Sequence, residues 1–232
     1  MKKNILIVGG SSGIGLELVK QIHSKNNLFV ANRSNEGLNG LPVTYIPYDV
    51  ETDELEISIL PETLDGLVYC PGTINLRPFK GLKPEVFFKD FSINVMGAVK
   101  TLQSVLGRLN NCETCASVVF FSTVAVQTGM PFHASVATAK GALEGLSRSL
   151  AAELAPKIRF NVIAPSLIDT PLAEKFLNND TKKSNAAARH PLQRVGSPEE
   201  IAQITEFLLS NKSSWVTAQT LTVDGGIGSI KS

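Results

Sequence analysis

The stretch NILIVGGSSGIG at residues 4–15 decides how the rest of the chain is interpreted. Its first half, ILIV, is an uninterrupted apolar run, which is typical of a parallel strand buried on both faces. Gly9, Gly13 and Gly15 follow at once. Glycine lets bare backbone approach a phosphate, and the N-terminus of a following helix favours negative charge. The stretch therefore predicts a strand, a phosphate-binding turn and a helix, although any glycine-rich strand-to-helix turn has a similar pattern.

Length and charge narrow the class of protein. The 232 residues fit one domain, spanning residues 1–232. The 22 basic and 21 acidic side chains form no long run of either sign, so the sequence has no electrostatic footprint for nucleic acid or an anionic membrane. No apolar stretch is long enough to span a bilayer, and no secretory signal precedes the first strand. We therefore expect a cytoplasmic protein with a small-molecule partner, and neither nucleic acid nor a membrane as partner.

The three cysteines do not suggest chemistry. Cys70, Cys112 and Cys115 are an odd number in a chain expected in the cytoplasm, which argues against a disulfide framework. Cys112 and Cys115 form a CxxC, but one such pair lacks the second pair of ligands of a structural zinc site. We expect free loop thiols and no metal.

Apolar runs alternate with helical patterns along the chain. The runs predict strands at residues 5–8, 28–31, 43–48, 66–70, 117–121, 159–163 and 220–223. Helical spacing predicts helices at residues 14–25, 84–108 with a break near Ser92, 135–154, and after Ser197. The connection 34–41 is too short for a full helix, and 52–60 is expected to form a turn or two of helix. The pattern predicts an α/β fold with a doubly wound, seven-stranded parallel sheet and a mobile substrate lid at 166–190.

The end of the second strand bears on the choice of cofactor. In dinucleotide-binding folds an acidic residue there bonds the free ribose hydroxyl of NAD, whereas a basic residue accepts the extra phosphate of NADP. This chain has Asn32 followed by Arg33. The pair favours NADP, with NAD possible, and the alternative is that Arg33 is a solvated surface residue.

Further motifs occur in a fixed order along the chain. They are Asp49-Val50, Pro71-Gly72, SINVMGAV at 92–99, FFST at 120–123, AKGALEGLSRSLAAELAP at 139–156, RFNVIAPSLIDTP at 159–171, RVGSPEEIA at 194–202 and LTVDGG at 221–226. With GGSSGIG at 9–15, the chain resembles the short-chain dehydrogenase/reductase family over nearly its whole length. The resemblance implies a Rossmann-type sheet with helices on both faces, bound NAD or NADP, and a homo-oligomer, tetramer or dimer, packed through its long helices.

The resemblance also implies which residues contact the cofactor. These are Gly9, Ser11, Ser12, Gly13, Ile14, Gly15, Asn32, Arg33, Asp49, Val50, Pro71, Gly72, Asn94, Lys140, Pro165, Ile168 and Thr170. In this family the lysine also binds the nicotinamide ribose, so Lys140 supports cofactor binding even without catalysis. Alternatively, Asn94 has only a structural role, in which its side chain forms a hydrogen bond to the backbone where the long helix is distorted. Thr170 would contact the nicotinamide carboxamide or merely cap the segment after it.

One catalytic position departs from the family pattern. The family uses an asparagine, a serine, a tyrosine and a lysine, with the tyrosine four residues before the lysine. Here the asparagine and lysine places are Asn94 and Lys140, the serine place is Thr123, and the tyrosine place is Val136. The substitution removes the acid that would protonate the alkoxide left by hydride transfer.

A replacement acid has to come from nearby residues. The tyrosines at 45, 48 and 69 belong to early strands, so the candidates are His133, Ser135 and Thr123. Histidine titrates near neutrality and is the best acid of the three, unless His133 is a loop residue bonded to backbone.

These residues leave three functions open. The first is an NAD(P)-dependent oxidoreductase acting on a small carbonyl or alcohol with Asn94, Thr123, Lys140 and His133 as its catalytic group. The second is a catalytically inactive NADP-binding sensor or partner subunit, and the third is an isomerase or dehydratase on the same scaffold. The first is favoured because the hydroxyl, amide and ammonium groups remain.

Overall fold

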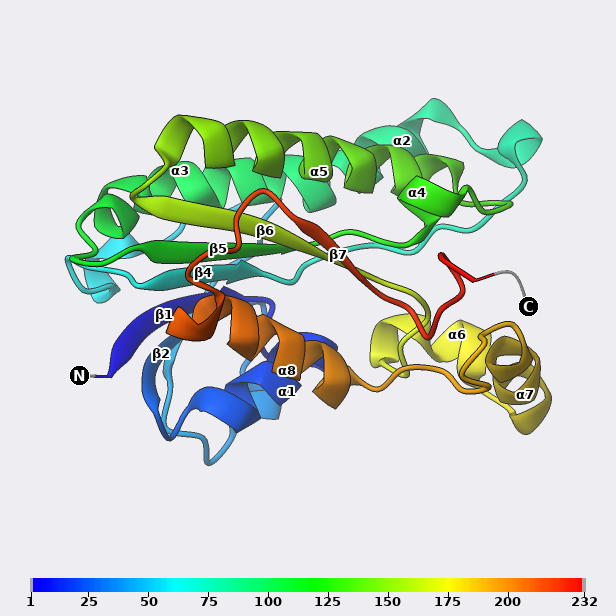
Figure 1. Cartoon of the computed structure of the whole chain (residues 1–232), viewed down its shortest axis with the longest axis horizontal. Coiled ribbons are helices and arrows are strands. Elements are labelled where there is room, and N and C mark those ends of the chain that lie inside the picture. The colour runs from blue at the N-terminus through cyan, green and yellow to red at the C-terminus, as the bar shows by residue number, and fades with distance from the viewer. Residues whose placement is uncertain (1, 231–232) are drawn as a thin grey trace.

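A computed structural model describes residues 2–230, and it contains a seven-stranded sheet in which every pair of neighbouring strands is parallel. The spatial order is β3-β2-β1-β4-β5-β6-β7 (Figure 1). The strands are β1 Lys3–Val8, β2 Asn26–Asn32, β3 Thr44–Pro47, β4 Gly66–Tyr69, β5 Ala116–Phe121, β6 Ile158–Pro165 and β7 Thr220–Val223. The direction of winding reverses between β1 and β4, where open α/β sheets bind ligands. The predicted fold class, a single-domain Rossmann-type sheet, is confirmed. The outermost positions of the predicted domain, 1 and 231–232, lie outside the described residues.

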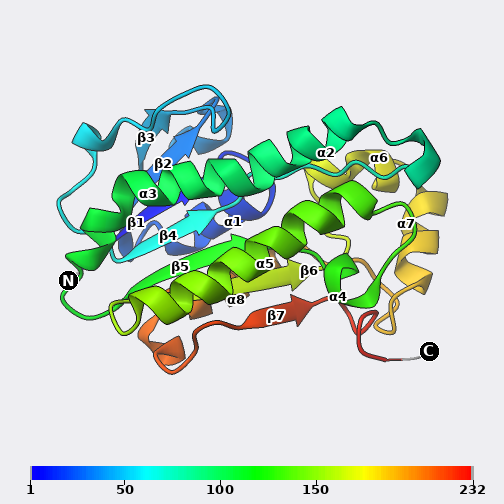
Figure 2. The same ribbon diagram turned by 90° about the horizontal axis from the view of Figure 1, so that it is seen from above.

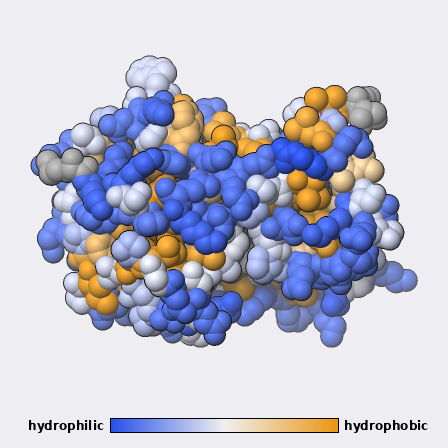
Figure 3. All heavy atoms as spheres, turned by 90° about the horizontal axis from the view of Figure 1, so that it is seen from below, coloured by the Kyte–Doolittle hydropathy of each residue, from blue (hydrophilic) through white to orange (hydrophobic). Residues whose placement is uncertain are grey.

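Helices cover both faces of the sheet. One layer contains α2 Pro84–Phe91, α3 Gly97–Asn110 and α5 Ala134–Leu154, and the other contains α1 Gly13–Ile22 and α8 Pro198–Leu209 (Figures 1 and 2). The apolar run of β1 serves both layers: Leu6 packs in the cluster with α3 and α5, whereas Ile7 packs in the cluster with α1 and α8. Both side chains have no exposed area, which explains why this strand lacks polar residues. The outer face over α1 and α8 is predominantly hydrophilic (Figure 3).

Most predicted elements form, with shifts at their ends. Helix α1 ends at Ile22 rather than at residue 25, because β2 begins at Asn26. The segment 52–60, expected to form a turn or two of helix, contains one 3-10 turn, Ile57–Ile59. The short crossover 34–41 likewise contains a single 3-10 turn, Glu36–Leu38. Helix α8 starts after Ser197 as predicted, and a reciprocal capping box between Ser197 and Glu200 fixes its start.

The predicted break near Ser92 is a π turn, Ser92–Met96, between α2 and α3. Two contacts hold the wide turn: the Asn94 amide donates to the Asp90 carbonyl at 2.7 Å, and the Tyr69 hydroxyl donates to the Ile93 carbonyl at 2.6 Å. Such π turns inside helices are frequent at functional sites. Here the turn brings Asn94 into the interior with no exposed area.

The predicted lid, residues 166–190, folds into short helices beside the carboxyl edge of the sheet. They are a 3-10 turn Pro171–Ala173, α6 Glu174–Leu177 and α7 Asp180–Ala188 (Figure 1). The lid has a small apolar cluster of its own, in which Ala173, Leu177 and Ala186 are buried. Its mobility stays a prediction. Helix α4, Ala125–Thr128, is one turn in the loop on the opposite side of the same edge (Figure 2).

Three findings concern features that the sequence argues against. Within residues 2–230, no helix is long and apolar enough to cross a membrane. No group of three or more metal-ligating side chains gathers in that part of the chain. Cys70, Cys112 and Cys115 are all free.

Candidate active site

A cavity of about 570 Å³, the nucleotide cavity, lies at the carboxyl ends of β1, β2 and β4. Of the residues expected to contact the cofactor, thirteen line it: Gly9, Ser11, Ser12, Gly13, Ile14, Gly15, Asn32, Arg33, Asp49, Val50, Pro71, Gly72 and Thr170. Segments from five parts of the chain thus meet around one space. Asn94, Lys140, Pro165 and Ile168 do not line it.

Two glycines of the turn after β1 allow the backbone to pass close to neighbouring segments at this cavity. Gly9 has a φ of +80°, and a Cβ on it would lie 3.1 Å from the side chains of Cys70 and Pro71. A Cβ on Gly15 would lie 2.2 Å from the carbonyl oxygen of Gly9. No side chain can replace these glycines without moving the turn, and the N-terminus of α1 follows directly. The geometry fits a bound diphosphate.

The end of β2 offers polar groups to a ribose. Asn32 is buried, and neither its side-chain oxygen nor its nitrogen has a partner within the described residues. An unpartnered buried amide on a cavity wall suits a hydroxyl-bearing ligand. Arg33 is exposed on the same wall. Glu36, three residues after Arg33, has no predicted role, but it also lines this cavity and adds a carboxylate to its wall.

A second cavity of about 550 Å³, the substrate cavity, adjoins the first at Ile14, Cys70, Gly72, Thr170 and Leu172. Three of the four expected catalytic residues line it, namely Thr123, His133 and Lys140. Val136 also lines it, one turn before Lys140 on α5, and is 5% exposed. Pro165 and Ile168 line this cavity rather than the nucleotide cavity.

Lys140 lies at the junction of the two cavities. A Cβ on Gly72 would lie 3.3 Å from Lys140 Nζ and 3.2 Å from Asn94 Oδ1, so both polar atoms converge on that glycine. Burial lowers the pKa of Lys140 to about 8, although the nearby Cys70 and Asp90 act in the opposite direction. The ammonium is therefore easier to deprotonate than an ordinary lysine.

Asn94 lines neither cavity, and the nitrogen of its side-chain amide makes contacts that hold the fold together. Its Nδ2 donates to the Asp90 carbonyl and to Thr73 Oγ1 at 3.0 Å, which is the backbone role considered as its alternative. Its Oδ1 is buried with no hydrogen-bond partner among residues 2–230 and, like Lys140 Nζ, lies close to Gly72. The buried carboxylate of Asp90 accepts from Thr73 Oγ1 at 2.5 Å and from Asn75 Nδ2 at 2.7 Å, so it anchors the loop after β4.

The candidate acids differ in their contacts. His133 Nδ1 lies 2.7 Å from the Pro131 carbonyl, the backbone contact that its alternative anticipated. Because a carbonyl can only accept, this contact puts a proton on Nδ1 and leaves Nε2 for other partners. Ser135 is buried and its hydroxyl has no partner within residues 2–230. Ser135 does not line the substrate cavity.

The tyrosines lie elsewhere, as expected. The hydroxyl of Tyr45 donates to the Asn32 carbonyl, and Tyr48 and Thr101 share a hydrogen bond of 3.0 Å. Tyr69 is held by the π turn. None of the three lines the substrate cavity.

A polar pair that sequence reasoning missed lies in the substrate cavity. Ser166 Oγ lies 2.8 Å from His190 Nε2, and His190 Nδ1 lies 2.8 Å from the Ala186 carbonyl. His190 is 4% exposed. Ser166 follows Pro165 in the RFNVIAPSLIDTP motif, and His190 precedes Pro191, but nothing in the sequence indicated that the two would meet.

Comparisons with known proteins identify the family of the chain. A family model described as enoyl-(acyl carrier protein) reductase matches residues 10–228. L-xylulose reductase from Bos taurus is 31% identical over 97% of this chain and 96% of its own length. The 3-oxoacyl-[acyl-carrier-protein] reductase of Thermotoga maritima is 30% identical over 97% of each chain. The chain belongs to the short-chain dehydrogenase/reductase family. It is thus an NAD(P)-dependent oxidoreductase of that family, which confirms the predicted enzyme class.

Solved structures of short-chain dehydrogenases/reductases have the same fold. A short-chain type dehydrogenase/reductase from Mycobacterium ulcerans has a TM-score of 0.88 at 26% identity, covering 97% of this chain and 90% of its own. A tyrosine-to-phenylalanine variant of ElxO with NADPH bound has a TM-score of 0.88 at 25% identity, covering 99% of this chain and all of its own.

Proposed function

We propose that this short-chain dehydrogenase/reductase reduces a small carbonyl compound, or oxidises the alcohol, with NADP as cofactor and without a tyrosine acid. The observation that carries the proposal is the convergence of Lys140 Nζ and Asn94 Oδ1 on Gly72, where the nucleotide and substrate cavities meet. Polar groups at that junction can reach a cofactor ribose on one side and a substrate oxygen on the other.

Support for NADP comes from the end of β2. The Arg33 guanidinium on the wall of the nucleotide cavity is suited to a ribose phosphate. A protein of similar structure, the ElxO variant, has NADPH bound. Glu36 on the same wall opposes this preference, since a carboxylate repels a phosphate. NAD therefore remains the second choice of cofactor.

The residues of the substrate cavity would act on the reacting oxygen. When bound, the nicotinamide cofactor supplies a hydride. The Thr123 hydroxyl and the Lys140 ammonium would donate hydrogen bonds to the oxygen that gains negative charge. We propose that Val136 occupies the place of the family tyrosine, so the proton comes from water or from Nε2 of a His133 imidazolium, whose ring carries a proton on both nitrogens. Turnover without the tyrosine is expected to be slower by about 10²- to 10⁴-fold, the usual contribution of a general acid.

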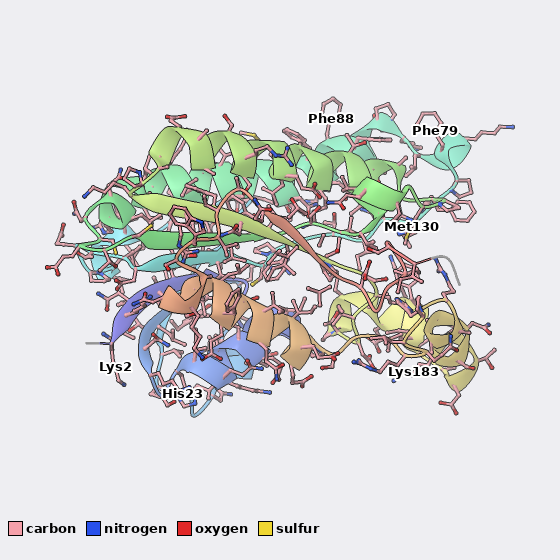
Figure 4. All side chains as sticks on the ribbon, viewed as in Figure 1. Lys2, His23, Phe79, Phe88, Met130 and Lys183 are labelled. Atoms are coloured by element: carbon pink, nitrogen blue, oxygen red, sulfur yellow. The ribbon has the colours of Figure 1, made fainter. Side chains whose placement is uncertain are left out.

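Several features outside the reaction centre belong to the same proposal. Residues 166–190 would act as a lid, since they form one wall of the substrate cavity. Phe79 and Phe88 are 74% and 75% exposed and point away from the body of the protein (Figure 4). Exposed phenylalanines near α2 support a homo-oligomer, which sedimentation would measure. The cytoplasmic location stays a prediction.

The experiment that tests the function follows NADPH by absorbance and fluorescence while ketones and aldehydes are added to the purified protein. We expect saturable NADPH binding and a slow fall in absorbance with at least one compound. Lys140→Ala should remove most of this turnover, whereas Arg148→Ala, an exposed position on the same helix, should not. Full activity in Lys140→Ala would contradict the proposed site.

The second candidate function rests on Val136. If NADPH binds but no absorbance change follows with any compound, the chain is an inactive NADP-binding sensor or partner subunit. A partner protein recovered in the presence of NADPH and absent without it would then identify that role.

A further inference from the structure

The charged side chains on the wall of the substrate cavity are all basic. They are Lys140, Lys175, Lys182 and Arg189, and among the lining residues in the described part of the chain there is no aspartate or glutamate. The whole chain has 22 basic and 21 acidic residues, so its composition does not explain this bias.

The lid separates its charges by sign. Residues 166–190 contain four basic and three acidic side chains, and basic and acidic residues are interspersed along the sequence. Three of the basic ones line the cavity, and none of the acidic ones does. The fourth basic residue, Lys183, points elsewhere and forms an ion pair of 3.0 Å with Asp169. The fold thus directs cations inward and leaves the acids outside.

Neutral groups hold two of the lid cations in place. Lys175 Nζ donates to the Ile74 carbonyl at 2.7 Å, and Lys182 Nζ donates to the Lys175 carbonyl and to Asn178 Oδ1, both at 2.9 Å. Carbonyl oxygens orient an ammonium without cancelling its charge. An ammonium has three donors, so two remain on Lys175 and one on Lys182. Within residues 2–230, neither lysine forms an ion pair, and neither does Arg189.

The lid cations are placed for a substrate rather than for the cofactor. Lys175, Lys182 and Arg189 do not line the nucleotide cavity. The rest of the substrate cavity is largely apolar, with Met130 on the wall opposite the lid (Figure 4) and Val136 beside Lys140. A ligand that matches this wall has an apolar body and an anionic end.

We infer that the substrate of this enzyme carries a carboxylate or phosphate, remote from the reacting carbonyl, which binds the cations Lys175, Lys182 and Arg189 at the lid end of the substrate cavity. The inference rests on the proposed function, which makes the ligand of this cavity a substrate. It adds the chemical class of that substrate: an anion is expected because a neutral ketone would leave the three cations without a counter-charge.

The test compares matched carbonyl compounds that differ in charge. 4-Acetylbenzoate and 4-acetylphenyl phosphate provide the carboxylate and phosphate arms, and methyl 4-acetylbenzoate provides the neutral control. We expect a lower KM for at least one anion than for the ester. Each exposed cation should contribute about threefold, and the preference should fall as salt is raised to about 0.5 M. An equal KM for all three compounds would overturn the inference.

Adjacent lysines on α7 supply the matched variants. Lys182→Gln should raise the KM of the preferred anion about threefold, and Lys182→Gln combined with Arg189→Gln about tenfold, with little change for the ester. Lys183→Gln removes the same charge at the next position, outside the cavity, and should have no effect. Loss of NADPH binding in the Lys182 variants would instead assign the cations to the cofactor and overturn the inference.

A binding measurement separates this inference from the proposed function. Calorimetry of 4-acetylbenzoate and its ester with the protein–NADPH complex requires no turnover. If the anion binds more tightly than the ester through Lys182 but is never reduced, the anion site stands and the reductase proposal fails. If the ester is reduced with the same KM as the anion and binds equally tightly, the reductase proposal stands and the anion site fails.

Discussion

The substitution Val136→Tyr tests whether a missing acid limits this short-chain dehydrogenase/reductase. Val136 is 5% exposed, lines the substrate cavity, and lies four residues before Lys140 on α5. A phenol at this position would extend into a cavity of about 550 Å³ rather than into packed core. The Lys140 ammonium, one turn away, would lower the pKa of the phenol toward neutrality.

The expected rise in kcat for Val136→Tyr follows from the rate enhancement that a general acid usually provides. Such a group contributes about 10²- to 10⁴-fold, which corresponds to about 3–5 kcal/mol of transition-state stabilisation. A new ring at a nearly buried position costs about 1–3 kcal/mol of folding stability, which the protein has to tolerate. If imperfect placement of the hydroxyl forfeits about tenfold, kcat still rises by about 10- to 1,000-fold.

The assay is the rate of NADPH oxidation with the best carbonyl compound, measured for wild type, Val136→Tyr and Val136→Phe. Phenylalanine adds the same ring without the hydroxyl, so the difference between the two variants isolates the proton donor. A Val136→Tyr protein that is folded, binds NADPH as wild type does, and is no faster than Val136→Phe would refute the reasoning. Val136 would then not occupy the place of the acid.

Three other changes have expected outcomes. Because burial lowers the pKa of Lys140 from 10.5 to about 8, the unfolded chain binds the proton more tightly, and stability rises between pH 8 and pH 10.5. Lys140→Met should therefore raise the free energy of unfolding at pH 7 by up to about 3 kcal/mol, and urea titrations should show the advantage shrinking by pH 10. Gly97→Ala places a Cβ 2.2 Å from the Tyr69 hydroxyl and should cost about 2 kcal/mol, whereas Gly107→Ala on the same helix meets open space and should add about 0.5–1 kcal/mol by the same titration. Arg33→Ala should weaken NADPH binding about fivefold in fluorescence titrations and leave NADH nearly unchanged; equal losses for both cofactors would contradict its role.

The fold could be predicted because its decisive signals are local. Central strands such as β4, Gly66–Tyr69, are short apolar runs buried on both faces, and the partly buried β7, Thr220–Val223, has the predicted bounds. The end of α1 at Ile22 could not be predicted from local sequence, because the start of the next strand decides where the helix stops. The break near Ser92 was expected, but its form as a π turn depends on Tyr69, which lies in β4 and far away in sequence.

The candidate site could be predicted from the sequence where a single short motif supplies a whole part of the cavity lining. Thirteen residues expected to contact the cofactor line the nucleotide cavity, and each lies in a short motif at the end of a strand. The pair Ser166 and His190 and the carboxylate of Glu36 were missed, because each acquires its setting from segments that meet only in the folded chain. Lys182 faces the cavity and Lys183 faces away from it because of how α7 is rotated within the folded lid, which the sequence does not show.

The two histidines of the substrate cavity are not equivalent as proton sources. Both ring nitrogens of His190 are engaged, one by the Ala186 carbonyl and the other by Ser166 Oγ, so a proton could leave it only through that serine. Within residues 2–230, the His133 ring has one hydrogen bond, at Nδ1, and its Nε2 has none; His133 and Val136 both line the substrate cavity. A general acid must reach the reacting oxygen directly or through one water. His133 is therefore the stronger candidate to replace the tyrosine, and the Ser166–His190 pair is better suited to shaping the cavity than to supplying the proton.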